Sequence, residues 1–152
     1  MRAVIQRCTS PASVSVNAEI TGRIEKGLVV YIGVEEGDTT EDIEWLARKI
    51  IALRIFNDSE GKMNLSVTDI KGGLLIISQF TLHGNVKKGN RPSFINAAKP
   101  EYANKMYLDF INHIKNSYSV PLATGIFAAH MLIDYINDGP VTIIIDTKNK
   151  NL

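Results

Sequence analysis

Apolar and polar residues alternate in short runs over the first 34 positions of the chain. Segments that favour β-strands occupy residues 3–8, 13–16 and 19–24. Residues 28–34 form a longer run that is apolar on both faces, which is typical of a strand buried inside a sheet. The N-terminal part of the chain is therefore predicted to be a group of strands with one central member.

Apolar residues at helical intervals predict two helices. The first follows Asp38-Thr39-Thr40-Glu41, in which Asp38 and Glu41 have the spacing of a capping box. The second begins at Pro100, because proline is favoured in the first turn of a helix. The apolar faces consist of Ile43, Leu46, Ala47, Ile50 and Leu53 in the first helix and of Ala103, Met106, Tyr107, Phe110 and Ile114 in the second.

Strand patterns return between and after the two helices. Residues 57–61 form a turn cluster, and Gly72-Gly73 precedes a second run, 74–77, that is apolar on both faces. The order of strands, helix, strand, helix and strands indicates an α/β or α+β protein with its helices packed on one side of a sheet. The strands predicted beyond Pro121 cover residues 124–127, 131–136 and 141–145.

The length and composition fit one globular domain over residues 1–152. Apolar residues make up 45% of the chain and charged residues 22%, which is ordinary for a soluble protein. A chain of this size buries roughly 68–70% of its unfolded surface, so a stable core is expected without disulfides. The single cysteine, Cys8, cannot form an intramolecular disulfide and is predicted to pack in a strand.

The charge balance limits the possible partners. Lys and Arg number 17 against 16 Asp and Glu, so the net charge of +1 provides no long-range field that would attract a polyanion. Any nucleic-acid contact is expected to be local, and DNA is not expected as a partner. The N-terminus places Arg2, Gln6 and Arg7 where a secretory signal would be apolar, and the run 27–34 is far shorter than the roughly 20 residues that cross a bilayer. A cytoplasmic location without membrane contact is expected.

The stretch Ser78-Gln79-Phe80-Thr81-Leu82 is the first candidate site, since it follows the predicted strand at 74–77. The ends of central strands hold polar backbone groups rigidly while leaving them free, and open sheets place ligands there. Two hydroxyls, an amide and an aromatic ring would meet at this strand end. A structural interpretation is equally open, because Ser and Thr often satisfy backbone groups at strand ends and Phe80 could fill the core.

The second candidate is the loop 83–94, which contains glycines and three fixed positive charges but no acidic residue. Lys87, Lys88 and Arg91 could hold phosphates, as the end of an RNA would require. Short basic runs are more commonly solvated surface, so the loop alone does not decide the function.

The three histidines, His83, His113 and His130, form no recognisable metal or nucleophile motif. His113 falls on the second predicted helix, and the sequence has no His/Cys/Asp/Glu group with zinc-ligand spacing. It also has no Gly-x-Ser-x-Gly elbow, P-loop or Gly-x-Gly-x-x-Gly after a strand. No metal and no cofactor are therefore expected.

The stretch Asn137-Asp138-Gly139-Pro140-Val141-Thr142 joins turn-forming residues to a strand. Proline fixes its own φ and restricts the residue before it, so Gly139 and Pro140 would present two carbonyl oxygens that have little freedom to turn away. Such a corner could be a rigid functional element. Most Gly-Pro pairs are plain turns, however, and only about 5–6% of X-Pro bonds in folded proteins are cis.

Residues 78–82 and 137–142 resemble the two motifs of the D-aminoacyl-tRNA deacylase family. The resemblance covers nearly the whole chain and extends through residues 5–7, 53–56, 61–64, 91–94 and 124–127. The sequence departs from the family pattern at Ala128, where many members have glycine, and at His130, where an acidic or small polar residue is more common. These departures put the pocket wall near His130 in doubt.

The resemblance implies a homodimer of three-layer α/β/β subunits with mixed sheets and two main helices. It also implies that the peptide between Gly139 and Pro140 is cis and enters the partner subunit's pocket, where the two carbonyl oxygens would collide with an L side chain. This steric rejection would be the basis of chiral proofreading in translation. Because glycine has no side chain to reject, mischarged glycyl-tRNA is expected as a further substrate.

The implied reaction is hydrolysis of the ester that joins a D-amino acid to the terminal adenosine of tRNA. The backbone N–H groups of Phe80 and Thr81 are expected to stabilise the oxyanion. In an alternative mechanism the Thr81 hydroxyl is the nucleophile, and His83 is a weakly supported candidate for its general base. A non-catalytic tRNA-binding or interaction module on the same fold is the alternative from a different class. The residues expected to line the substrate pocket are Ser78, Gln79, Phe80 and Met131, and those expected to contact tRNA are Lys87, Lys88 and Arg91.

Overall fold

A computed structural model describes residues 1–151 of the chain as a mixed α/β fold with two α-helices and several sheets. The helices are α1 (Thr40–Ala52) and α2 (Pro100–Ser117), and a short 3-10 helix, η1, covers Phe80–His83. The strands are β1 (Arg2–Cys8), β2 (Ala12–Val16), β3 (Glu19–Ile24), β4 (Gly27–Gly33), β5 (Phe56–Asn57), β6 (Met63–Leu65), β7 (Gly73–Ser78), β8 (Leu122–Thr124), β9 (Leu132–Asp134) and β10 (Thr142–Asp146).

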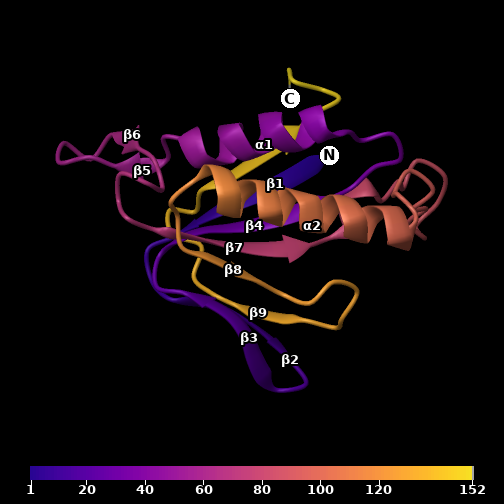
Figure 1. Ribbon diagram of the computed structural model, residues 1–152, viewed down its shortest axis with the longest axis horizontal. Coiled ribbons are helices and arrows are strands. Elements are labelled where there is room, and N and C mark those ends of the chain that lie inside the picture. Colours follow the sequence, from indigo (N-terminus) through magenta and orange to yellow (C-terminus); the bar gives the residue numbers. More distant parts are fainter. Residues whose placement is uncertain (152) are drawn as a thin grey trace.

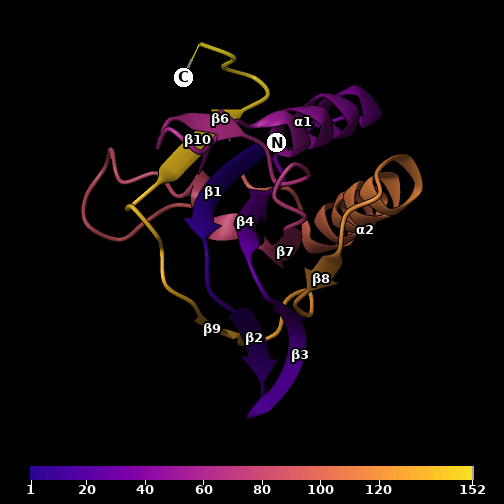
Figure 2. The same cartoon turned by 90° about the vertical axis from the view of Figure 1, so that its left-hand side faces the viewer.

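The strands form a five-stranded sheet in the order β10-β1-β4-β7-β8, a three-stranded sheet in the order β3-β2-β9, and the small hairpin β5-β6. In the large sheet β1 is antiparallel to both of its neighbours, whereas β4, β7 and β8 run parallel. Figure 1 shows both helices on one face of this sheet and the three-stranded sheet on the other. The predicted packing of the helices on one side is confirmed, and the elements form three layers (Figure 2).

Two apolar clusters join the layers. The larger one lies between the helices and the large sheet and includes Leu46, Leu74 and Phe110. The smaller one lies between the two sheets and includes Cys8 and Val29, so the prediction that Cys8 packs in a strand is confirmed. The central strands β4 and β7 are buried on both faces, as their continuous apolar runs predicted.

The local predictions fail in four places. The N-terminus of α1 is capped one residue later than expected: Thr39 is the N-cap, and its N–H donates to the carboxylate of Asp42 over 2.8 Å. The strand predicted at 124–127 ends at Thr124, and β9 is shorter than the predicted 131–136. The turn cluster at 57–61 belongs to the hairpin β5-β6, which was not predicted.

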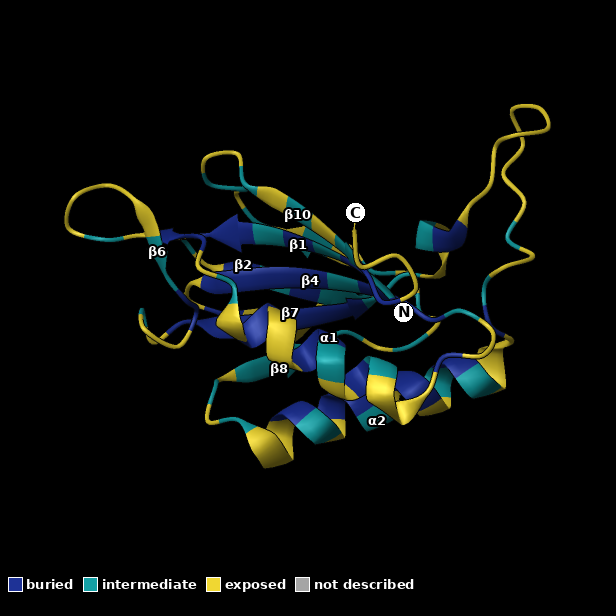
Figure 3. Cartoon of the chain, turned by 90° about the horizontal axis from the view of Figure 1, so that it is seen from above, coloured by how far each residue is buried: buried dark blue, intermediate teal, exposed yellow. Residues whose placement is uncertain are grey.

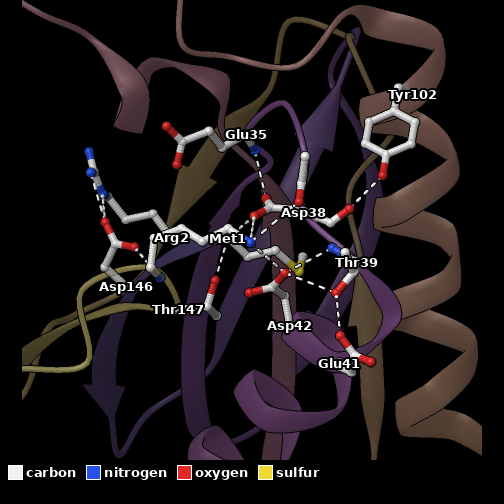
Figure 4. A network of polar contacts seen from close by, with 12 residues as sticks. Met1, Arg2, Glu35, Asp38, Thr39, Glu41, Asp42, Tyr102, Asp146 and Thr147 are labelled. Carbon is white, nitrogen blue, oxygen red and sulfur yellow. Dashed lines mark hydrogen bonds and ion pairs between the residues drawn. The ribbon is translucent and has the colours of Figure 1, made fainter.

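Asp38 does not cap α1 because its carboxylate serves a buried ion pair (Figure 4). Its Oδ1 accepts a hydrogen bond from the Met1 amine over 2.5 Å, and its Oδ2 accepts one from the Glu35 N–H over 2.7 Å. The same amine donates to the Thr147 hydroxyl over 2.6 Å. Both charged groups are fully buried, so this network ties β1, the start of α1 and the end of β10 together.

Within residues 1–151, neither helix is long and apolar enough to cross a membrane.

Replacing Asp38 by alanine is expected to lower the free energy of unfolding by about 3–5 kcal/mol, because it leaves a buried ammonium group without its counter-charge. Urea unfolding followed by circular dichroism measures this loss. Asp109→Ala is the control, since it breaks an exposed ion pair with Lys105 on α2. An effect of Asp38→Ala no larger than that of Asp109→Ala would contradict a structural role for the buried pair.

Candidate functional site

A cavity of about 610 Å³ opens at the carboxyl ends of the parallel strands β4, β7 and β8. The register of β4 and β7 places Ile32 beside Ser78, so both strands end at the same level. The start of α2 covers one side of the opening, with Lys99 as its N-cap and no capping side chain. The volume is within the range of cavities that enclose small molecules, and the location is where open sheets bind ligands.

The turn that follows β7, residues 78–83, supplies one wall of this cavity. Ser78, Gln79 and Phe80 line it, and Phe80 keeps 57% of its surface exposed at the opening. The Gln79 N–H donates to the carbonyl of Ile32 over 2.7 Å and continues the ladder of the sheet. Within residues 1–151, the next two backbone N–H groups, those of Phe80 and Thr81, have no hydrogen-bond acceptor.

Arg2 of β1 binds the turn after β7 and so attaches it to the large sheet. Its Nη1 donates to the carbonyl of Leu82 over 2.6 Å, while Nε and Nη2 both donate to one carboxylate oxygen of Asp146, over 2.9 and 2.8 Å. Burial would raise the pKa of Asp146, but the hydrogen bonds from Arg2 and from the Lys148 N–H hold that pKa below its usual value. Asp146 therefore remains ionised at neutral pH and keeps the guanidinium oriented toward the turn.

The Thr81 side chain has no base beside it among the described residues. Its hydroxyl accepts a hydrogen bond from the Gln79 amide over 2.5 Å, and Thr81 does not line the cavity. His83 is 3% exposed, its Nε2 has no hydrogen-bond partner within residues 1–151, and it packs against Gly33. A Cβ at Gly33 would lie only 2.9 Å from that nitrogen, which explains why glycine ends β4. The structure thus does not bring His83 to the Thr81 hydroxyl.

The opposite wall of the cavity is formed by residues 127–131, which include both departures from the family pattern. Ala128 has a φ of 61°, in the left-handed region that favours glycine, so glycine would adopt this backbone conformation with less strain than alanine. His130 and Met131 both line the cavity, and the role of Met131 in binding the substrate stays a prediction.

Tyr107 of α2 closes the inner side of the cavity. Its hydroxyl donates to the carbonyl of Ile76 over 2.9 Å. Burial raises the pKa of Tyr107, so the phenol stays protonated and remains a donor. This residue was predicted only as part of an apolar helix face.

The basic loop lies outside the cavity. Lys87, Lys88 and Arg91 are exposed on a loop that projects from the body of the molecule (Figure 3). Two backbone hydrogen bonds between Asn85 and Ser93, of 2.8 and 2.9 Å, hold the base of the loop together. The loop reaches the cavity opening through Phe94, whose ring meets the edge of Phe80 with centroids 5.0 Å apart.

The corner at residues 137–142 lies away from the cavity of its own chain. Gly139 and Pro140 are both exposed, and the peptide bond between them is cis, as the resemblance implied. Figure 3 shows this loop, at the start of β10, at the opposite end of the large sheet from the turn after β7. The structure therefore does not bring the corner and the pocket residues together within one chain.

Arg7 of β1 is buried, with 7% of the residue exposed, and it holds the corner in place. Its Nε donates to the Asp138 carbonyl over 3.1 Å, and its Nη2 lies 3.2 Å from the Asp138 carboxylate. Its Nη1 donates to the Ile55 carbonyl over 2.8 Å and to the Asn57 side chain over 3.3 Å. The sequence placed Arg7 only inside a strand, and no local signal indicated these distant partners.

Within residues 1–151, no group of three or more His, Cys, Asp and Glu side chains is placed to hold a metal ion.

Known proteins resemble the chain over nearly its full length. A sequence model of the D-Tyr-tRNA(Tyr) deacylase family matches residues 4–146. Over 150 residues, the chain is 51% identical to a D-aminoacyl-tRNA deacylase of Flavobacterium johnsoniae and 53% identical to one of Natranaerobius thermophilus. Each alignment covers 99% of both chains.

Solved structures share the fold. One described as "c-Myc DNA Unwinding Element Binding Protein" has a TM-score of 0.91 and 40% identity, covering 97% of this chain and 99% of the other. A second, described as a probable eukaryotic D-amino acid tRNA deacylase, has a TM-score of 0.78 at 17% identity, covering 95% and 97%, and shows similarity of fold alone. The match to the family model and the identities over nearly the full length show that the chain belongs to the D-Tyr-tRNA(Tyr) deacylase family.

Proposed function

We propose that this chain is a hydrolase that cleaves the ester bond of D-aminoacyl-tRNA and releases the free D-amino acid and tRNA. The observation that carries the proposal is the turn after β7, which lines the cavity with Ser78, Gln79 and Phe80 and leaves two backbone N–H groups free. Full-length relatives named D-aminoacyl-tRNA deacylase support the same reaction. The enzyme would work in the cytoplasm, where translation supplies the substrate.

The proposed chemistry is attack of water on the ester carbonyl carbon. The free N–H groups of Phe80, which lines the cavity, and of Thr81, which follows it in the turn, stabilise the negative charge that develops on the carbonyl oxygen. Such a contribution is worth about 2.7–4 kcal/mol per donor in a well-studied protease. The bond from the carbonyl carbon to the ribose oxygen then breaks, and that oxygen takes up a proton as the terminal hydroxyl of the tRNA. The substrate's neighbouring 2′-hydroxyl assists the attacking water. No nucleophilic side chain is needed in this scheme, because the ester is already activated.

The active unit is proposed to be a homodimer in which the corner of one subunit enters the cavity of the other. Two observations support this arrangement: Gly139 and Pro140 are exposed, and they lie outside the cavity of their own chain. Apolar side chains are exposed on the segment that leads from β9 to the corner, with Leu132 and Ile136 64% and 70% exposed. The carbonyl oxygens of Gly139 and Pro140 would exclude an L side chain, while a D side chain points elsewhere.

The basic loop is proposed to contact the acceptor end of the tRNA. Lys87, Lys88 and Arg91 are exposed, and the loop joins the cavity opening through Phe94. Phosphate contacts of this kind orient a nucleic acid without reading its sequence. They are short-ranged here, because a net charge of +1 adds no general attraction.

Matched D-tyrosyl-tRNA, L-tyrosyl-tRNA and glycyl-tRNA test the proposed reaction. The purified protein is expected to hydrolyse the first and the third, because neither presents an L side chain to the corner, and to spare the second. Loss of the aminoacyl ester over time is the measurement, with buffer alone as the background. Binding of all three without turnover would instead favour a non-catalytic tRNA-binding module.

Thr81→Ala tests the source of catalysis. The variant keeps the backbone N–H group, so it is expected to retain substantial deacylation, within about tenfold of the unchanged protein. The measurement is single-turnover hydrolysis of D-tyrosyl-tRNA. A rate close to the uncatalysed one would establish the Thr81 hydroxyl as the nucleophile and overturn the backbone mechanism.

Gly139→Ala tests the corner. Gly139 has a φ of +128°, and an added Cβ would lie 2.7 Å from the Val141 side chain and 3.0 Å from Arg7, so the corner must shift. The ratio of D-tyrosyl to L-tyrosyl hydrolysis is expected to change by about tenfold or more. Gly61→Ala is the control, since Gly61 also has a positive φ but has no atom within 4 Å of the added carbon. An unchanged ratio in Gly139→Ala would contradict the proposed role of the corner.

A further inference from the structure

The side chain of Asn137 closes the corner a second time, beside the backbone bonds that Arg7 makes with Asp138 and Val141. Its Oδ1 accepts a hydrogen bond from the Val141 N–H over 3.2 Å, and its Nδ2 donates to the Thr142 hydroxyl over 3.1 Å. These two bonds span Gly139 and Pro140, so that pair belongs to a ring closed by the Asn137 side chain.

The Thr142 hydroxyl also accepts a hydrogen bond from Nε2 of Gln6 over 2.9 Å. Gln6 lies directly opposite Thr142 in the antiparallel pair of β1 and β10. The ring around the corner is therefore attached to the large sheet through an amide. We call the set Asn137, Thr142 and Gln6 the Asn137 brace.

Two tyrosines fix the orientation of the Gln6 amide. The Tyr135 hydroxyl donates to Gln6 Oε1, and the Tyr31 and Tyr135 hydroxyls lie 3.0 Å apart. Because a phenol has only one proton, Tyr135 must accept from Tyr31 while it donates to Gln6. With its oxygen occupied in this way, the Gln6 amide can only turn its NH₂ group to Thr142. The pKa of Tyr31 is raised by burial and then by Tyr135, so Tyr31 keeps the proton that starts this chain.

The backbone of Arg7 fixes the two ends of the corner, since its N–H donates to the Val141 carbonyl over 3.2 Å and its carbonyl accepts from the Asp138 N–H over 2.9 Å. Gly139, Pro140 and Thr142 are exposed, so apolar packing contributes little to their position. Hydrogen bonds are directional, and two of them that close a ring of six residues restrict the orientation of the peptide planes inside it.

We propose that the Asn137 brace is a specificity-determining device, in which Asn137, Thr142 and Gln6 are positioning residues that orient the carbonyl oxygens of Gly139 and Pro140 against L-aminoacyl groups. The inference rests on the proposed role of the corner, which it deepens. None of the three residues touches the reacting ester. Losing the brace lets the carbonyl oxygens turn and makes room for an L side chain, while the turn after β7 keeps its catalytic groups.

Asn137→Ala is the decisive variant, because it removes both bonds of Asn137 at once. Its hydrolysis of L-tyrosyl-tRNA is expected to rise about tenfold relative to that of D-tyrosyl-tRNA. The free energy of two ordinary hydrogen bonds is large enough to account for a change of this size. Asn137→Asp is the conservative variant: its carboxylate still accepts from Val141 and can accept from the Thr142 hydroxyl, so it is expected to restore most of the discrimination. A gain in L-tyrosyl turnover cannot result from a smaller folded fraction, which would lower both rates together.

Thr142→Val and Thr21→Val form a matched pair. Both remove a hydroxyl from an exposed threonine on a strand. Thr21 lies on β3, however, and within residues 1–151 its hydroxyl bonds only to the Val14 carbonyl, over 3.4 Å. The ratio of L to D hydrolysis is expected to rise about threefold in Thr142→Val and to stay unchanged in Thr21→Val. Amide hydrogen exchange at Val141 is expected to accelerate in Asn137→Ala, which reports the corner directly.

Comparison with Gly139→Ala separates failure of the brace from failure of the corner. If Gly139→Ala changes the D to L ratio and Asn137→Ala leaves it unchanged, the proposed role of the Asn137 brace is wrong and the proposed role of the corner is retained. An unchanged ratio in both variants overturns the two proposals together. The proposed hydrolysis is tested independently, because turnover of D-tyrosyl-tRNA by the unchanged protein does not depend on either variant.

Discussion

The parallel pairing of β4 with β7 is the constraint on which the site depends. Because Ile32 and Ser78 are register partners, both strands end at the same level, and the ladder makes its last bond from the Gln79 N–H to Ile32. The next two N–H groups have no acceptor within residues 1–151, although the chain before them is rigidly held. They are the first two of η1, and the first N–H groups of a helix have no partner inside it. Here they arise from where the ladder stops, without a special side chain.

Strand β1 connects the two halves of the proposed site and also keeps them apart. Arg2 near its start holds the turn after β7 and is oriented by Asp146, while Arg7 near its end holds the corner and pairs with Asp138. Five residues of antiparallel strand span about 17 Å. A corner fixed at that distance cannot close the cavity of its own chain, so the geometry of one strand argues for a second subunit as the place where it acts.

The sequence predicted what depends on neighbouring residues and missed what depends on distant ones. The apolar runs of β4 and β7 and the periodicity of both helices are local, and these elements were found. The cap of α1 was misplaced by one residue, because Asp38 is taken by the Met1 amine, which lies 37 positions away in sequence. The partners of Arg7 lie 48 to 131 positions away, so only the fold reveals them. For the same reason the pocket motif was identified but not the wall that Tyr107 provides.

The two halves of the proposed site are held by different forces. The cavity lies against the buried core. Ile32, Ile77 and Tyr107 are tightly packed there, so moving them would cost packing energy. Gly139 and Pro140 are exposed, so the position of the corner depends on directional bonds from Arg7, which reach Asp138 and Val141, and from the Asn137 side chain. A substitution at Gly139 displaces the backbone of the corner itself. A substitution at a polar residue that orients the corner instead acts on the proposed selection step from outside, and it leaves the proposed oxyanion donors of the turn after β7 unchanged.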